Sequence, residues 1–183
     1  MHTNILSDLK VLEIATFVFA PGAGTILSDF GANVIHVEPP GIGDPHRKLS
    51  QLRPLPESEE NYCWDLDGRN KKSLVLDLKS QQGYAIVKKL LETTDVLITN
   101  YHPSVLEALK LTYEEVKIIN SSLVYAHGTG YGEKGEEIEK PGYDATAWWA
   151  RSGMMDAVRP KESELALAAP GMGDHPSSLS LVS

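Results

Sequence analysis

Five short apolar runs, separated by longer amphipathic stretches, constrain the fold of this chain more than any other feature of its sequence. Each run is nearly continuous in aliphatic residues, which is typical of strands buried on both faces of a parallel sheet. The alternation of such strands with helices predicts an α/β fold: a doubly wound, Rossmann-like, mainly parallel sheet of about five to six strands, with helices on both faces. The strands are expected at 11–15, 33–38, 73–78, 96–100 and 123–127.

Helices are predicted between these strands from apolar residues at helical spacing. Segment 23–30 has such a face, and Gly31 then offers a left-handed C-terminal position. Ser80 is expected to cap a second helix over 81–92. Two S/T-x-x-E capping boxes predict two short helices before the fifth strand. The boxes are Ser104 with Glu107 and Thr112 with Glu115.

Composition excludes several classes of protein. The chain has 183 residues, enough for one domain, and 17 Lys and Arg against 25 Asp and Glu give a net charge of −8, which argues against a nucleic-acid partner. One cysteine, Cys63, suits a reducing cytosol, and the histidines show no metal-ligand spacing. The longest uncharged stretch, 14–28, is interrupted by Pro21, and 1–10 lacks a signal-peptide core. We expect a soluble, cytoplasmic protein with no membrane partner.

Two segments do not follow the strand and helix pattern. Segment 39–68 is rich in proline, glycine and charge, and segment 128–142 is rich in glycine. Loops this long in a compact domain are usually functional. A helix is expected to restart at Tyr143, and its Trp148 and Trp149 are expected in the core, although they could stack on an aromatic ligand.

Two glycine patterns follow predicted strands, and neither matches a Walker-type phosphate loop. Gly22 and Gly24 follow the first strand and Glu38 ends the second, as in a dinucleotide site, but Leu27 replaces the third glycine. We therefore favour small residues that let a helix approach the sheet, and keep NAD binding as an alternative. The glycines of 128–132 follow the fifth strand, where open α/β sheets bind ligands, but they could equally form a flexible connection.

A glycine-flanked acid lies near residue 174. Gly171 and Gly173 precede Asp174, and Pro176 follows, which predicts a turn into a helix with Asp174 as its N-cap. Helix N–H groups would hold that carboxylate ionised, and such a carboxylate can act as a nucleophile. The plainer interpretation is a structural cap alone. His175 is expected to face solvent.

Together and in order, these motifs resemble the class III CoA-transferase family, which contains formyl-CoA and carnitine CoA-transferases and the α-methylacyl-CoA racemase. The resemblance covers about 9–181 and looks closest to the branch that acts on aryl and branched-chain hydroxy or enoyl acids. It is carried by Leu9-Lys-Val-Leu-Glu13, by Leu27-Ser-Asp29-Phe-Gly31 through Glu38-Pro-Pro-Gly41-Ile-Gly43-Asp44, by Arg69-Asn-Lys71-Lys72-Ser73, by Asp95-Val-Leu-Ile-Thr-Asn100-Tyr-His-Pro103, and by Gly171-Met-Gly173-Asp174.

The resemblance implies a mechanism centred on Asp174. In the family, the matching aspartate attacks an acyl-CoA thioester, forms a mixed anhydride and then an aspartyl-CoA thioester, and CoA finally moves to an acceptor carboxylate. Backbone N–H groups of 171–173 or Gly130 are candidates for stabilising the oxyanions. No tightly bound cofactor is implied, since CoA and acyl-CoA are substrates. The positions that match CoA contacts are Phe17, Val18, Arg47, Leu76, Lys79, Asn100 and Tyr101.

Other interpretations of these positions stay open. Lys79 could be a solvated helix-start lysine and Arg47 a loop charge. Tyr143 stands where the racemase branch has a histidine, which argues against racemisation because that reaction needs two proton-transfer groups.

The resemblance also predicts how the chain is organised. Residues 1–183 match the family's N-terminal CoA-binding domain, whereas its second small domain and return segment lie beyond them. The family forms an interlocked homodimer. The alternative from another class is a CoA-binding domain without catalysis.

Overall fold

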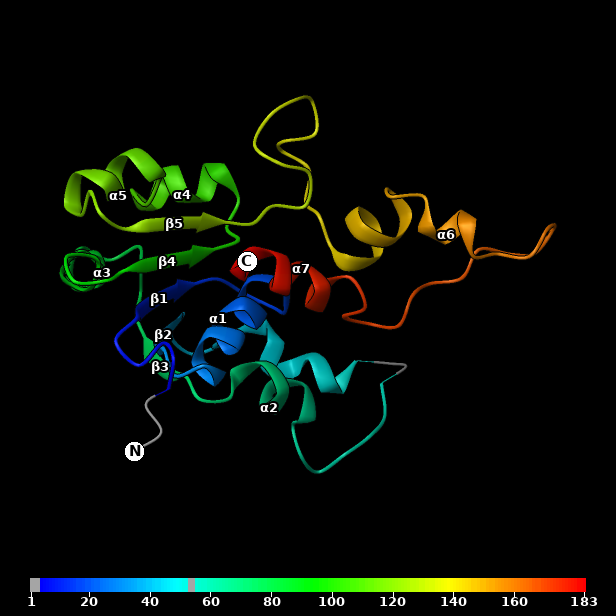
Figure 1. Cartoon of the computed structure of the whole chain (residues 1–183), viewed down its shortest axis with the longest axis horizontal. Coiled ribbons are helices and arrows are strands. Elements are labelled where there is room, and N and C mark those ends of the chain that lie inside the picture. The colour runs from blue at the N-terminus through cyan, green and yellow to red at the C-terminus, as the bar shows by residue number, and fades with distance from the viewer. Residues whose placement is uncertain (1–3, 53–54) are drawn as a thin grey trace.

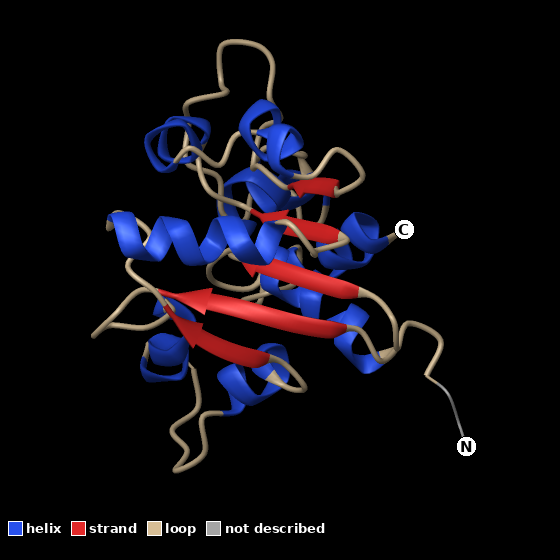
Figure 2. Ribbon diagram, turned by 90° about the vertical axis from the view of Figure 1, so that its left-hand side faces the viewer, coloured by secondary structure: helices blue, strands red, loops and turns tan. Residues whose placement is uncertain are grey.

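The computed structural model describes residues 4–52 and 55–183. Its five strands form one sheet in the order β3-β2-β1-β4-β5, and every neighbouring pair is parallel (Figures 1 and 2). All five predicted strands are confirmed: the bounds of β2 match the prediction, and the ends of the other strands differ from it by at most three residues. The strands are β1 (Lys10–Ile14), β2 (Asn33–Glu38), β3 (Lys72–Val75), β4 (Val96–Thr99) and β5 (Val124–His127).

Two apolar clusters lie on opposite faces of the sheet because successive strand residues point to opposite sides. Leu12 and Leu97 belong to the cluster that includes residues of α3 (Gln81–Leu91), α4 (Pro103–Leu109) and α5 (Tyr113–Ile119). The other cluster contains Val11, Val34 and Ile98, and it includes residues of α1 (Phe19–Asp29) and α7 (Asp174–Val182). The expected helices on both faces are therefore confirmed.

Helix α7 packs along α1 although the two are far apart in sequence (Figure 1). Ser178 donates a hydrogen bond of 2.6 Å to the Phe19 carbonyl. A side chain on Gly22 would come within 2.5 Å of the Ser178 hydroxyl oxygen, so this glycine permits the close approach. A helix as short as α7 is marginal alone, and α1 supplies the partner that stabilises it.

The predicted helix starts are partly confirmed. Ser80 accepts a hydrogen bond from the Gly83 N–H and caps α3. Thr112 and Glu115 form the predicted capping box of α5. The predicted Ser104 box is wrong, because α4 begins at Pro103 and places Ser104 inside the helix. Two further helices lie between segment 128–142 and α7: the π-helix η2 (Asp144–Ala150) and α6 (Met154–Ala157).

The prediction of one long loop over 39–68 is wrong. The segment contains the 3-10 helix η1 (Pro45–Gln51) and the helix α2 (Tyr62–Gly68), while residues 53 and 54 lie outside the described residues. The Asp44 side chain caps η1, and the Asn61 side chain caps α2. These caps satisfy free backbone N–H groups and allow helices in a segment with few apolar residues.

The glycine-rich segment 128–142 is a loop, as predicted. Gly130 and Gly142 pack so closely that a side chain on either would overlap the other's backbone, which closes the base of the loop. In the described part of the chain, no helix has the length and hydropathy needed to cross a bilayer.

Candidate active site

The loop between β1 and α1 presents Phe17 at the surface. Phe17 has a left-handed backbone (φ 64°), and its side chain is 38% exposed. Its N–H donates to Asp44 Oδ1 at 3.1 Å, and its carbonyl accepts from His46 Nδ1 at 2.9 Å. These buried partners hold a conformation that is uncommon for a bulky residue. The Phe17 ring contacts the Tyr143 ring edge to face, with centroids 6.4 Å apart.

Asp174 is the first residue of α7, and Gly173, not Asp174, is the N-cap. The prediction of a capping carboxylate is therefore wrong by one position. Gly173 is buried against Trp148, and its N–H donates to Asp144 Oδ1 at 2.9 Å. A side chain at Gly173 would come within 2.5 Å of that same oxygen. The Met172 N–H already bonds the Ala169 carbonyl, so two N–H groups of the predicted oxyanion site have partners.

The carboxyl of Asp174 is harder to ionise than an ordinary aspartate. Burial raises its pKa to about 6, and the negative charges of Asp144 and Asp67 act in the same direction, against His175. The expected stabilisation of the ionised form by a capping geometry is not found. At pH 7 the group is still mostly ionised, and its higher basicity makes it a better nucleophile than an unperturbed carboxylate.

A cavity of about 990 Å³ brings together three of the predicted CoA contacts: Leu76, Lys79 and Tyr101. It lies beside the ends of β2 and β3 and is also lined by residues of α3 and α4. Leu76 is buried and Lys79 is exposed, so the cavity offers an apolar wall with a cation at the surface. Burial raises the pKa of the Tyr101 hydroxyl, with a smaller effect of the Asp44 charge.

The other predicted contacts lie outside this cavity. The Asn100 side chain bonds the Thr16 backbone twice, at 2.9 and 2.8 Å, and so holds the loop that carries Phe17. Val18 is buried at the start of α1. The Arg47 guanidinium makes two hydrogen bonds to Glu38, at 2.7 and 2.6 Å, and is not part of the lining that contains Lys79.

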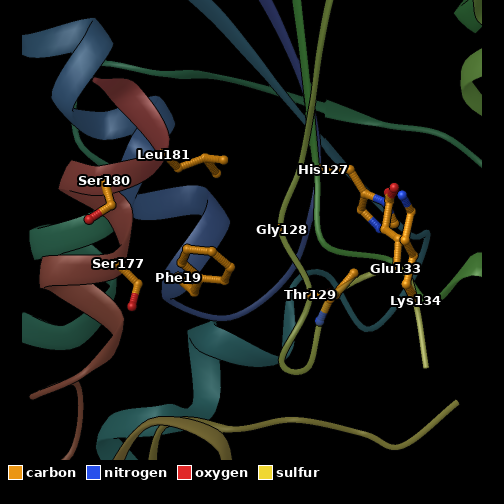
Figure 3. Close-up of a pocket in the computed structure, with 10 residues that line it drawn as sticks. Phe19, His127, Gly128, Thr129, Glu133, Lys134, Ser177, Ser180 and Leu181 are labelled. Atoms are coloured by element: carbon orange, nitrogen blue, oxygen red, sulfur yellow. The ribbon is translucent and has the colours of Figure 1, made fainter. Parts of the chain in front are cut away.

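A second cavity, of about 680 Å³, separates the end of β5 from α7. Phe19 and Leu181 face it from α1 and α7 (Figure 3). His127 and Thr129 face it from the other side. A side chain on Gly128 would overlap the Phe19 ring, so the first glycine of this pattern permits a close approach. The glycine pattern thus lines a cavity at the carboxyl end of the sheet, where ligands bind in such folds.

A buried network of charged side chains, which sequence reasoning missed, lies beneath the Phe17 loop. His36 bonds Glu13 at 2.6 Å and faces Asp44 at 3.3 Å. Burial alone would lower the pKa of His36, but Asp44 and Glu13 raise it to about 9. Lys71 bonds both Glu13 oxygens at 3.0 Å. No periodicity marks these residues, since each comes from a different element.

The remaining expectations concern glycines, histidine and tryptophan. Gly24 lies inside α1 and a side chain there would overlap Glu13, so the close-approach interpretation is confirmed. His175 is exposed as predicted, although its ring also contacts Asp67. Trp149 is buried as predicted, and its indole N–H donates to a backbone carbonyl at 2.8 Å. Over residues 4–52 and 55–183, no group of three His, Cys, Asp or Glu side chains could hold a metal ion.

Comparison with known proteins identifies relatives of the chain. A cinnamoyl-CoA:phenyllactate CoA-transferase from Clostridium sporogenes is 42% identical over 182 residues, 98% of this chain and 44% of that protein. A (R)-2-hydroxy-4-methylpentanoate CoA-transferase from Clostridioides difficile is 37% identical and aligns with 97% of this chain and 44% of that protein. The chain therefore spans less than half the length of these curated relatives.

Solved structures share the fold. The crystal structure of Rv3272 from Mycobacterium tuberculosis superposes with a TM-score of 0.87 at 29% identity, covering 98% of this chain and 49% of that one. A CAIB/BAIF family protein from Brucella suis gives a TM-score of 0.83 at 29% identity, covering 99% and 50%. The model of CoA-transferase family III matches residues 6–183. This chain belongs to CoA-transferase family III.

Proposed function

We propose that residues 1–183 form the CoA-binding, nucleophile-bearing domain of an enzyme that transfers CoA from an acyl-CoA thioester to a carboxylic acid. The observation that carries the proposal is Asp174, a partly buried carboxylate with a pKa of about 6 at the start of α7. It follows a glycine turn and is ionised near neutral pH, while its basicity exceeds that of an ordinary aspartate. Membership of a CoA-transferase family supports the same reaction.

The proposed reaction consists of four acyl transfers. An Asp174 oxygen attacks the thioester carbonyl, the C–S bond breaks, and a mixed anhydride and CoA thiolate form. The thiolate attacks the aspartyl carbonyl, which releases the donor acid and leaves an aspartyl-CoA thioester. The acceptor carboxylate then displaces the thiolate to form a second anhydride. Attack of the thiolate on the acceptor carbonyl gives the new acyl-CoA and frees Asp174, with no net proton transfer.

The substrate class is proposed from the relatives' names and from the aromatic surface near the site. Those names include phenyllactate and 2-hydroxy-4-methylpentanoate, an aryl and a branched-chain 2-hydroxy acid. Phe17 and Tyr143 form an edge-to-face pair, and both side chains are exposed. Such a pair suits an apolar acyl group. We therefore propose 2-hydroxy acids with apolar side chains as acceptors.

The cavity of about 990 Å³ is the proposed site for the nucleotide end of CoA. Tyr84 and Tyr101 line it and offer ring surfaces for the adenine, while Lys79 and Lys110 offer cations for phosphates. These cations matter because the whole chain carries a net charge of −8, which disfavours an anionic ligand at long range.

Asp174→Asn is the direct test of the proposed nucleophile. Hydroxylamine traps an aspartyl anhydride or thioester as a hydroxamate, so wild-type protein incubated with a donor thioester should carry that mass change on Asp174. We expect transfer and trapping to be lost in Asp174→Asn and kept in Asp156→Asn, which removes an exposed carboxylate. Undiminished transfer in Asp174→Asn would disprove the role.

Lys79→Ala tests the proposed CoA cavity. Removing one exposed cation should weaken CoA binding by about two- to fivefold at low salt, with a smaller effect at high salt. Isothermal titration calorimetry measures this change. Lys88→Ala is the control, because Lys88 is an exposed cation of α3 outside the cavity lining. Equal losses in both variants would place the CoA phosphates elsewhere.

The same two experiments separate transfer from CoA binding alone. Binding of CoA by the 183-residue chain without trapping on Asp174 would favour the non-catalytic alternative. A homodimer is also part of the proposal, and light scattering measures the mass that decides it.

A further inference from the structure

Asp67 is a buried carboxylate that the proposed reaction does not use. It lies near the end of α2, and its side chain faces two imidazoles. Asp67 Oδ1 is 3.3 Å from His175 Nε2, and Asp67 Oδ2 is 3.6 Å from His46 Nε2. Its backbone carbonyl accepts a hydrogen bond from Thr25 of α1, which fixes this end of α2. The two carboxylate oxygens therefore point to histidines from separate parts of the chain.

The second nitrogen of each imidazole contacts a backbone carbonyl. His46 Nδ1 bonds the Phe17 carbonyl at 2.9 Å, and His175 Nδ1 bonds the Gly171 carbonyl at 2.9 Å. A backbone carbonyl only accepts hydrogen bonds, so Nδ1 of each ring donates to it. A continuous series of contacts thus joins the loop that carries Phe17 to the turn that precedes Asp174, and Asp67 lies at its centre.

The His46 end of this connection is buried, whereas the His175 end is accessible to solvent. His46 is 1% exposed, and its ring lies edge to face with Trp64 at 5.9 Å. The His175 side chain is 46% exposed. A cavity of about 110 Å³, lined in part by His46, Asp67 and Lys71, lies next to the longer contact. The contact between His46 Nε2 and Asp67 Oδ2 is longer than a hydrogen bond, and His46 Nε2 is buried without a hydrogen-bond partner among the described residues.

We propose that Asp67 is a positioning residue: by contacting His46 and His175 together, it fixes the Phe17 loop relative to the turn that carries Asp174. The proposal rests on the proposed function, because its consequence is the placement of Asp174 against a donor bound beside Phe17. A carboxylate suits this role, since it presents one oxygen to each imidazole. An amide offers one acceptor and places its NH₂ group against the second imidazole.

Asp67→Asn tests this role, with Asp65→Asn as the matched control. Asp65 lies in the same helix, is exposed, and carries the same charge. Two quantities are measured on the 183-residue chain: thiol release in a single turnover with a donor thioester, and the ring nitrogen and proton NMR signals of His46 and His175. We expect Asp67→Asn to slow thiol release by about 10- to 100-fold, because reacting groups are then misplaced. The donor concentration at half-maximal rate should change by less than about twofold.

The ring signals distinguish positioning from a general loss of structure. Both histidines should shift in Asp67→Asn and neither in Asp65→Asn, while the amide signals of β1 and β4 stay in place. A slower reaction with unchanged ring signals would overturn the proposal, and so would unchanged thiol release with shifted rings. If the wild-type chain releases no thiol, the proposed function fails. The positioning role of Asp67 is still tested in that case, because unchanged ring signals in Asp67→Asn would disprove it.

His175→Gln provides a second route if Asp67→Asn folds poorly. The His175 side chain is half exposed, so its replacement is tolerated better than that of a buried residue. The proposal expects His175→Gln to slow thiol release and to move the His46 signals through Asp67. His46 signals identical to those of wild type would show that the two imidazoles are not coupled and would overturn it.

Discussion

Burial and two carboxylates distant in sequence raise the pKa of Asp174. Asp144 begins η2 and Asp67 lies in α2, and the negative charge of each opposes ionisation of Asp174. Burial is the largest cause of the raised pKa. The proposed nucleophile is therefore more basic than an exposed aspartate and still ionised above about pH 6.

Asp144→Asn should shift the acidic limb of the pH profile of thiol release, in which Asp174 is the proposed nucleophile. Attack requires the ionised form, so the rate falls as the pH drops through the pKa of Asp174, which is about 6. Asp144 raises that pKa, and its neutral replacement keeps an oxygen that can accept the Gly173 N–H. We expect the limb to move down by about 0.5 to 1 pH unit, measured as thiol release between pH 4.5 and 8. Asp156→Asn is the control and should keep the wild-type pH profile. If the profile of Asp144→Asn is also unchanged, Asp144 does not raise the pKa of Asp174.

Arg47 shows why the role of a single charge could not be predicted from sequence. The family resemblance places Arg47 among the CoA contacts, with a loop charge as the alternative. In the structure its guanidinium pairs with Glu38 and stacks over Trp64 at 3.8 Å. Hydrogen bonds from Arg47 are the main cause that lowers the pKa of Glu38 to about 2. Lys79 matches a CoA contact by the same resemblance, but its side chain is exposed and lines the cavity of about 990 Å³.

At the scale of elements, two capping motifs that look alike in sequence behave differently. Thr112 precedes α5 and forms its box, whereas Ser104 lies within α4 because Pro103 takes the first helical position. Proline is favoured there since that position needs no N–H donor. Prediction from sequence failed at α4 because the proline and the capping box compete for the same helix start.

These two positions give a matched pair of variants. Thr112→Ala should lower the free energy of unfolding by about 1 kcal/mol, the usual cost of a lost N-cap. Ser104→Ala should change it by less than about 0.5 kcal/mol, since Ser104 caps no helix. Urea unfolding followed by circular dichroism measures both. Equal costs would mean that α4 starts where the sequence pattern places it.

Elements inside segment 39–68 were harder to predict than the strands. The strands carry aliphatic runs, which the sheet buries on both faces. Helices η1 and α2 instead depend on side-chain caps from Asp44 and Asn61 and on contacts with distant elements. Such contacts leave no periodic pattern in a short segment.

At the scale of the whole molecule, the charges divide into an exposed acidic surface and a buried network. The net charge of −8 counts all Lys, Arg, Asp and Glu of the chain and does not reveal that Glu13, His36 and Asp44 lie within the fold. Fold class and the positions of the strands were accessible from sequence because they depend on local patterns. Asp174 was named from its glycine motif, but its neighbours Asp67 and Asp144 were not, because the three meet only after the sheet and α7 have assembled.

His36 should make the stability of the molecule depend on pH. Its folded pKa of about 9 exceeds the ordinary value of 6.5, so the stabilisation is complete below pH 6.5 and is lost as the pH rises through 9. We expect a loss of about 1 to 3 kcal/mol across that interval. His36→Gln should remove this slope from urea unfolding curves, and His102→Gln, a partly exposed histidine, should keep it. Parallel pH curves for wild type and His36→Gln would rule out the assignment.

The pairing of α1 with α7 has a consequence for how the chain matures during synthesis. The hydrogen bond from Ser178 to Phe19 joins residues 159 positions apart. A ribosome therefore completes every strand of the sheet well before the partner of α1 emerges. Until then the small-residue face of α1 is open to chaperones or to other nascent chains, and the surroundings of Asp174 are incomplete. These surroundings form only after every strand of the sheet has been synthesised, when α7 docks on α1.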